Sequence, residues 1–160
     1  MASTYEKIAT TTLGSAAAST TFSSISSSYT DLVLICAAGQ SPDSTLELTF
    51  NSDSGNNYSR TIMYGTGSTA VSARGSNNPA IYISAGSSVG TNINIINIMN
   101  YANTTTYKTI VGRTNDTSSV TVATVGLWRN TNAINTIKLT GSNGNILSGS
   151  TFTLYGIKAA

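Results

Sequence analysis

The chain has 160 residues, a formal net charge of +2 and a charged fraction of 9%, far below the roughly 25% of an ordinary soluble domain. Thr, Ser and Asn account for 66 residues, whereas His is absent. Without an imidazole to activate any of the 50 Ser and Thr hydroxyls, Ser–His–Asp catalysis is excluded. The eight Lys and Arg residues are scattered singly, so we expect no nucleic-acid partner.

Short runs with period-two alternation recur along the chain between Gly, Ser and Asn clusters, and helical periodicity is hard to find. The clearest run places Leu46, Leu48 and Phe50 on one face with polar residues between them, as a half-buried strand requires. In chain order, the sequence predicts strands at residues 4–10, 19–25, 30–37, 45–50, 58–64, 69–74, 81–83, 91–101, 106–113, 119–128, 133–140 and 150–158.

This number of short strands predicts an all-β fold, because a single open sheet of about twelve strands would curl or split into two. We expect a jelly-roll-type two-sheet β-sandwich with little or no helix, forming a single domain over residues 1–160. The Ser-rich residues 14–28 belong to it, since Phe22 and Ile25 resemble core anchors. A shift in phase from Ile93 and Ile95 to the next isoleucines predicts a bulge or corner.

Two further local patterns concern a turn and a thiol. Asn143 and Gly144 separate two apolar segments and predict a hairpin, because both residue types tolerate positive φ. Cys36 lies in the apolar run 32–38, so we expect a small buried hydrophobe and no disulfide or thiolate metal cluster.

The start of the chain and its hydropathy bear on location. Residues 1–5 lack the basic and apolar regions of a secretion signal, and no stretch approaches the roughly 18 apolar residues of a membrane span. We therefore expect synthesis in the host cytoplasm and no membrane partner.

The carboxylates offer little chemistry. Glycoside hydrolysis needs two carboxyl groups that face each other across the substrate. The loop 51–57 has oxygen ligands at alternate positions, as a calcium site would. It carries a single carboxylate, so a solvated turn explains it better. We expect no enzyme activity, no metal and no cofactor. The six acids are dispersed at Glu6, Asp31, Asp43, Glu47, Asp53 and Asp116.

Aromatic residues are the remaining candidates for a binding surface. Tyr58, Tyr64 and Tyr101 flank Asn-rich turns, where exposed rings could stack on sugars. The alternative is that these rings fill the core and sheet faces of a β protein. The sequence therefore predicts a possible glycan-binding surface at these three residues.

The closing segment, residues 149–158, resembles the end of a group of small virion structural proteins of tailed bacteriophages, many from cyanophages and other aquatic phages. The likeness extends to residues 5–9, 50–58, 98–101 and 126–130. Proteins of this group are described as phage structural, tail-fibre-like or capsid-decorating components with jelly-roll-type sandwiches. The resemblance therefore implies a virion location.

A compact chain without collagen-like repeat, coiled coil or fibrous shaft favours the capsid surface over a fibre. We expect a decoration or cement protein on the outer capsid surface that binds the major capsid protein and itself, as a homo-oligomer. A trimer is expected because capsid lattices present threefold sites. The alternative is a tail-fibre or baseplate protein that binds host glycan, and a glycan-cleaving depolymerase is a further rival.

The terminal segments are the expected contact elements. Residues 5–8 and 152–157 are expected to pair with each other and to present a sheet edge to the lattice. The candidate lattice or oligomer contacts are Tyr5, Ile8, Phe152 and Tyr155.

Overall fold

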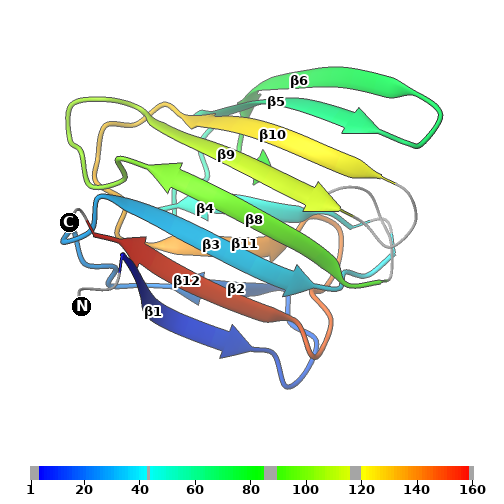
Figure 1. The fold of residues 1–160 in the computed structure, drawn as a ribbon, viewed down its shortest axis with the longest axis horizontal. Helices are drawn as coiled ribbons and strands as arrows, with labels where there is room; N and C mark the ends of the chain where they lie inside the picture. Colours follow the sequence, from blue (N-terminus) through cyan, green and yellow to red (C-terminus); the bar gives the residue numbers. More distant parts are fainter. Residues whose placement is uncertain (1–3, 43, 85–89, 116–119, 159–160) are drawn as a thin grey trace.

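The structure is a computed structural model that describes residues 4–42, 44–84, 90–115 and 120–158 (Figure 1). It contains twelve strands, and no helix occurs among these residues. The strands are β1 Tyr5–Thr12, β2 Ser19–Phe22, β3 Asp31–Ala38, β4 Leu46–Phe50, β5 Tyr58–Gly65, β6 Ala70–Asn78, β7 Ile81–Tyr82, β8 Asn92–Met99, β9 Lys108–Asn115, β10 Thr121–Trp128, β11 Ile137–Gly141 and β12 Thr151–Ile157.

The strands form two antiparallel sheets with the orders β1-β12-β3-β8-β9-β10-β5-β6 and β2-β11-β4-β7. The chain crosses between the sheets at each end of β2, β4, β7 and β11, the four strands of the smaller sheet. The quartet β1-β12-β3-β8 therefore matches β2-β11-β4-β7 strand for strand, which is the order of a jelly roll. The predicted all-β, two-sheet sandwich is confirmed.

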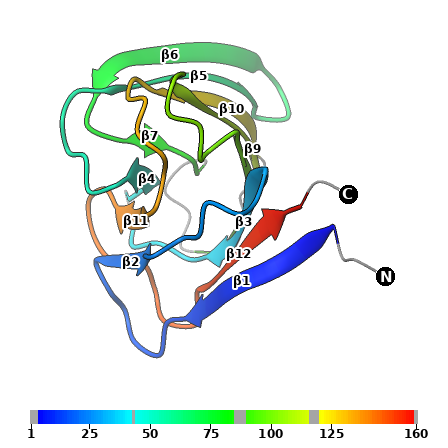
Figure 2. The same cartoon turned by 90° about the vertical axis from the view of Figure 1, so that its left-hand side faces the viewer.

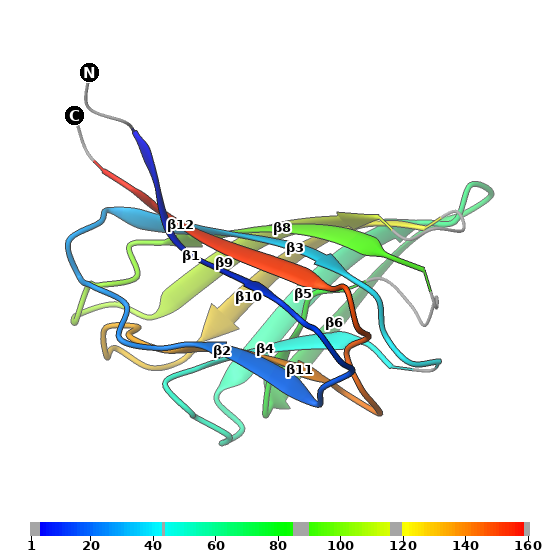
Figure 3. The ribbon, with the colours of Figure 1, turned by 90° about the horizontal axis from the view of Figure 1, so that it is seen from below.

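Two inserted hairpins widen the larger sheet. The β5–β6 hairpin lies between β4 and β7 in the chain, and the β9–β10 hairpin lies between β8 and β11; together they extend the sheet beyond β8. Figure 2 shows that the wider sheet curls around the narrower one, and Figure 3 shows both layers from another side. Arg60 of β5 helps to join the extension to the small sheet, because its guanidinium carbon lies 3.8 Å from the ring centroid of Tyr82 on β7.

The core lies between the sheets and follows the predicted alternation. Leu46, Leu48 and Phe50 of β4 are fully buried and alternate with partly exposed residues. The predicted anchors Phe22 and Ile25 are also buried. Cys36 is buried as predicted, and desolvation raises the pKa of its thiol.

An aromatic cluster binds the extension to the small sheet. The ring of Phe50 on β4 lies 5.5 Å from that of Trp128 on β10 and 6.4 Å from that of Tyr58 on β5, measured between centroids. Trp128 Nε1 donates a 2.7 Å hydrogen bond to Asp53 Oδ2, and Asp53 Oδ1 accepts from the Gly55 N–H. The turn after β4 therefore fixes the position of the Trp128 ring through Asp53.

Two local predictions are wrong. β8 contains no bulge: its register with β3 and β9 is continuous, so Asn92 and Asn94 face inward while Ile93 and Ile95 face outward. The turn at residues 143–144 does not close a hairpin, because the strands beside β11 are β2 and β4, and Ile146 instead bridges Ala17 and Gln40. The chain must leave β11 to cross to the other sheet, which overrides the local hairpin signal.

Substituting Gly126 tests the contact between β10 and β7. A Cβ at Gly126 would lie 2.8 Å from Ile110 Cγ1 and 2.9 Å from two side-chain atoms of Ile81. We expect Gly126→Ala to lower the free energy of unfolding by roughly 1–3 kcal/mol, the usual cost of overpacking. Gly14→Ala is the matched control, because nothing lies within 4 Å of that position; equal effects of the two substitutions in denaturant titrations would contradict this packing.

Asp53 should make the stability of the fold depend on acid. Burial alone would raise the pKa of Asp53, but hydrogen bonds from the side chains of Trp128 and Asn57 and from the Gly55 N–H lower it overall. A lowered folded-state pKa stabilises the fold above the unfolded-state pKa, and this contribution is lost as pH falls through the folded-state value. Denaturant titrations from about pH 6 to about pH 3 should therefore show a smaller loss of stability for Asp53→Asn than for the wild type. Parallel pH profiles would contradict the assignment.

Candidate protein-interaction face

The outward side chains of the larger sheet form rows across its strands, because the antiparallel register aligns them. One row contains Ile35 of β3, Ile95 of β8, Arg113 of β9, Ala123 of β10 and Met63 of β5. These residues belong to the sheet's outer face, which we call the broad face. The row beside it contains Val33, Asn97, Val111, Val125 and Thr61.

Large apolar side chains remain exposed on the broad face. The exposed fractions are 60% for Met63, 50% for Val125, 43% for Val111, 40% for Ile93 and 39% for Met99. Single exposed apolar residues are ordinary in soluble proteins. Neighbouring ones that form a continuous patch mark an interaction surface.

The outer face of the smaller sheet has a different character. Its outward positions hold hydroxyl groups, charged side chains and one tyrosine, and no aliphatic residue: Ser19, Thr21, Glu47, Thr49, Tyr82, Lys138 and Thr140. An ordinary soluble sandwich would present such a polar surface on both sides. Only the broad face departs from it, so this face is the candidate functional site.

The broad face is hollowed. One hollow of about 760 Å³ is lined by residues that include Met63, Ile93 and Ile95, and a second of about 550 Å³ is lined by residues that include Val33 and Val111. The two hollows share Ile95, Arg113 and Ala123 as lining residues. The apolar surface therefore continues across β3, β8, β9, β10 and β5.

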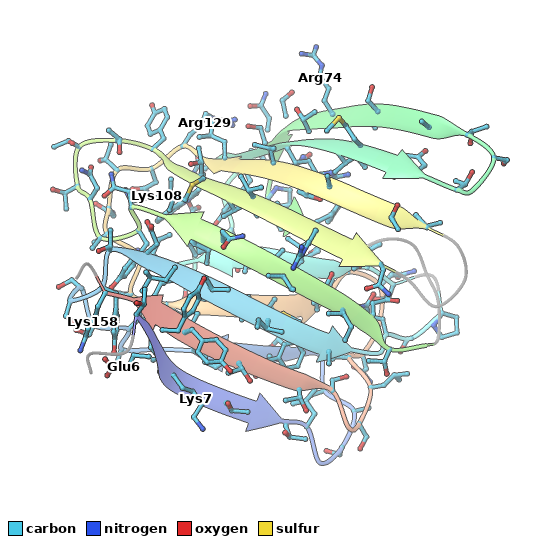
Figure 4. All side chains as sticks on the ribbon, viewed as in Figure 1. Glu6, Lys7, Arg74, Lys108, Arg129 and Lys158 are labelled. Atoms are coloured by element: carbon cyan, nitrogen blue, oxygen red, sulfur yellow. The ribbon has the colours of Figure 1, made fainter. Side chains whose placement is uncertain are left out.

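Few charged side chains lie on this face away from its edges. In Figure 4 the labelled Lys7 lies on β1 and the labelled Arg74 on β6, the two edge strands of the larger sheet. At the outward positions of its six inner strands, all within the described residues, the charged side chains are Arg113 and Asp31. Asp31 Oδ1 accepts a 2.6 Å hydrogen bond from the Asn100 N–H, whereas no hydrogen bond or ion pair joins the Arg113 side chain to another described residue.

The predicted sugar-stacking surface is wrong for two of its three tyrosines. Tyr58 and Tyr101 are fully buried. The ring of Tyr58 stacks on Trp128 with centroids 6.3 Å apart, and the Tyr101 hydroxyl donates to the Ser26 carbonyl oxygen. Tyr64 is partly exposed and lines the larger hollow.

The terminal strands pair as predicted, with Tyr5 opposite Ile157 in the β1–β12 ladder. Phe152 is fully buried in the core, so its prediction as a lattice contact is wrong. Ile8 sits where the register shifts and packs against the core, which leaves it partly buried. Tyr5, 57% exposed, lines the smaller hollow, and Tyr155 lies opposite Val33 at an outward position.

Sequence reasoning missed the residues that carry the broad face. Val111, Val125, Ile93 and Met63 lie in strands that mix apolar and polar residues on both sides, so alternation alone did not separate the two sides. One signal in the sequence could have indicated the broad face: the outward positions of β10 carry no charged residue. They are Thr121, Ala123, Val125 and Leu127.

The carboxylates of the described residues are dispersed. Glu6 pairs with Lys158, Asp31 and Asp53 accept the bonds given above, and Glu47 lies on the smaller sheet, where desolvation raises its pKa. Asp43 and Asp116 lie outside the described residues. No three metal-ligating side chains come together in the part of the chain that the structure describes.

Comparisons with known proteins add no family: no protein-family model matches the chain, and no curated protein matches it. Among the described residues, no helix with the length and hydropathy of a membrane span is found.

Polar substitutions on the broad face should lower the hydrophobicity of this surface without unfolding the protein. We expect Val111→Thr combined with Val125→Thr to lower fluorescence of a bound hydrophobic dye and to change the free energy of unfolding by less than about 0.5 kcal/mol, as for other surface changes. Val122→Thr is the matched control, because Val122 is the inward, buried neighbour on the same strand. It should cost roughly 1–3 kcal/mol. A large stability loss in the double variant would show that these valines are not exposed.

Proposed function

We propose that this protein is a structural component of a bacteriophage virion, a decoration or cement protein that binds the outer capsid surface. The observation that carries the proposal is the broad face: an apolar, almost uncharged sheet surface on one side of a jelly roll whose other side is polar. Such a surface suits docking to protein. The likeness of residues 149–158 to phage structural proteins supports the proposed location on a virion.

The work of such a protein is binding, not turnover. Burial of the broad face supplies a hydrophobic driving force of about 25 cal/mol for each Å² of apolar area removed from water. Only the part left after the costs of association and ordering appears as affinity. The major capsid protein is the proposed partner, together with further copies of this chain. Since a homo-oligomer touches several capsid subunits at once, avidity multiplies a modest affinity for each contact.

Host-glycan binding has less support. Two of the three tyrosines on which it rested, Tyr58 and Tyr101, are inside the core. A jelly roll also occurs in lectin domains, but function must be argued from the site. The surface of this sandwich that departs from ordinary polarity is aliphatic, with few aromatic rings.

The position and copy number on the particle test the proposal. Virions of the phage that encodes the chain should bind antibody against it over the head in electron micrographs. Quantitative mass spectrometry should count it at a level comparable to the major capsid protein, on the order of hundreds of copies, as a lattice-binding role with avidity requires. A few copies located at the tail would contradict decoration and favour the glycan-binding alternative.

A further inference from the structure

We infer that the broad face binds the broad face of a second copy of this chain, with Arg113 of each copy against Asp31 of the other. This differs from the proposed function in the occupant of the broad face. A face covered by a second copy cannot also dock on the capsid protein, so the capsid contact would lie elsewhere on the dimer. Three features of the face argue for a second copy as its occupant.

The first feature is its extent. The larger sheet has eight strands of up to nine residues. With strands about 4.8 Å apart and a rise of about 3.3 Å per residue, the six inner strands over seven residues cover roughly 650 Å². Specific interfaces bury about 600–1,000 Å² on each partner. Pairing of two broad faces would therefore give an interface of ordinary size.

The second feature is that its charges complement themselves. The six inner strands present one cation, Arg113, and one anion, Asp31, at their outward positions. A buried guanidinium without a partner is costly, and Arg113 has no partner within the described part of its own chain. One Asp31 oxygen accepts from the Asn100 N–H, and a second copy could approach the other.

The third feature is the placement of the two charges. Arg113 lies in the row of Ile95, and Asp31 lies in the row of Met99, two strands away. The spacing is about 16 Å, from two strand separations and four residues. Asn97 of β8 lies midway between them. A twofold axis in the plane of the interface, passing Asn97 and perpendicular to the line from Arg113 to Asp31, would bring each Arg113 over the other copy's Asp31.

The symmetry this requires is the commonest one among oligomers. A twofold interface uses the same patch on both subunits. Asn97 would face Asn97 of the second copy, where two amides can exchange hydrogen bonds. The valines and isoleucines of the neighbouring rows would surround these polar contacts and exclude water, as in the centre of other protein interfaces.

Charge reversal in purified protein tests the pairing. Sedimentation velocity of the wild type should give a mass of twice the 16.5 kDa chain. Arg113→Glu and Asp31→Lys should each weaken the dimer by at least about tenfold, because each places like charges together. The double variant, and an equimolar mixture of the two single variants, should restore it. Arg74→Glu at the sheet border is the control and should leave the dimer unchanged.

A cross-linking experiment serves even where one charge variant folds poorly. N97C, treated with a thiol cross-linker spanning the roughly 10 Å between packed sheets, should give covalent dimers. S72C should not, since Ser72 lies on the outermost strand, far from the axis. Cys36 is buried and should not react.

Several outcomes would overturn the inference. They are a monomer at all concentrations, equal cross-linking of N97C and S72C, or a trimer unaffected by either charge reversal. Loss of capsid binding by an Arg113→Glu variant that remains dimeric would assign the broad face to the capsid protein instead. A dimer that fails to bind capsids would leave the pairing intact and contradict only the proposed function.

Discussion

The packing of two sheets of unequal width against each other is the constraint on which the rest of the structure depends. The quartet β1-β12-β3-β8 matches the four-stranded sheet strand for strand, and the main aliphatic core lies between them. The inner side of β9, β10, β5 and β6 extends beyond the smaller sheet and must be buried by other contacts. Phe50, Tyr58 and Trp128 provide these contacts near β4, and Gly126 lets Ile81 of β7 approach β10 closely.

This unequal pairing explains why the two outer surfaces differ. The narrow sheet presents hydroxyls and charges, as a wet surface should. The wide sheet buries one side against the core and leaves a broad aliphatic surface on the other, interrupted by Arg113, Asp31 and Asn97. The surplus of Thr, Ser and Asn is therefore not spread evenly: threonines line the outward side of β1 and β12, and aliphatic residues take the middle. Local composition, more than the average over the chain, indicates where the candidate interaction face lies.

All twelve strands were predictable, because alternation and turn residues are local properties of the chain. The inward side of β8 was not, since Ile occurs at both parities and only continuous pairing with β3 and β9 decides the phase. Because of this register, Asn94 faces inward, where its Oδ1 accepts a 2.7 Å hydrogen bond from Thr114 Oγ1. Tyr58, Tyr101 and Phe152 were misplaced for a related reason: proximity to turns or chain ends says little about burial when rings supply so much of the core volume.

The central claim is that the broad face is covered by protein in the assembled state. Met63 and Met99, both exposed at outward positions of this face, can report on it through hydroxyl-radical oxidation, with Tyr107, a 54% exposed residue outside the sheet, as the internal reference. The rates should be compared between virions and purified protein diluted until monomeric. The account predicts that oxidation of both methionines falls several-fold in virions while that of Tyr107 is unchanged. Equal methionine oxidation in the two states would contradict it.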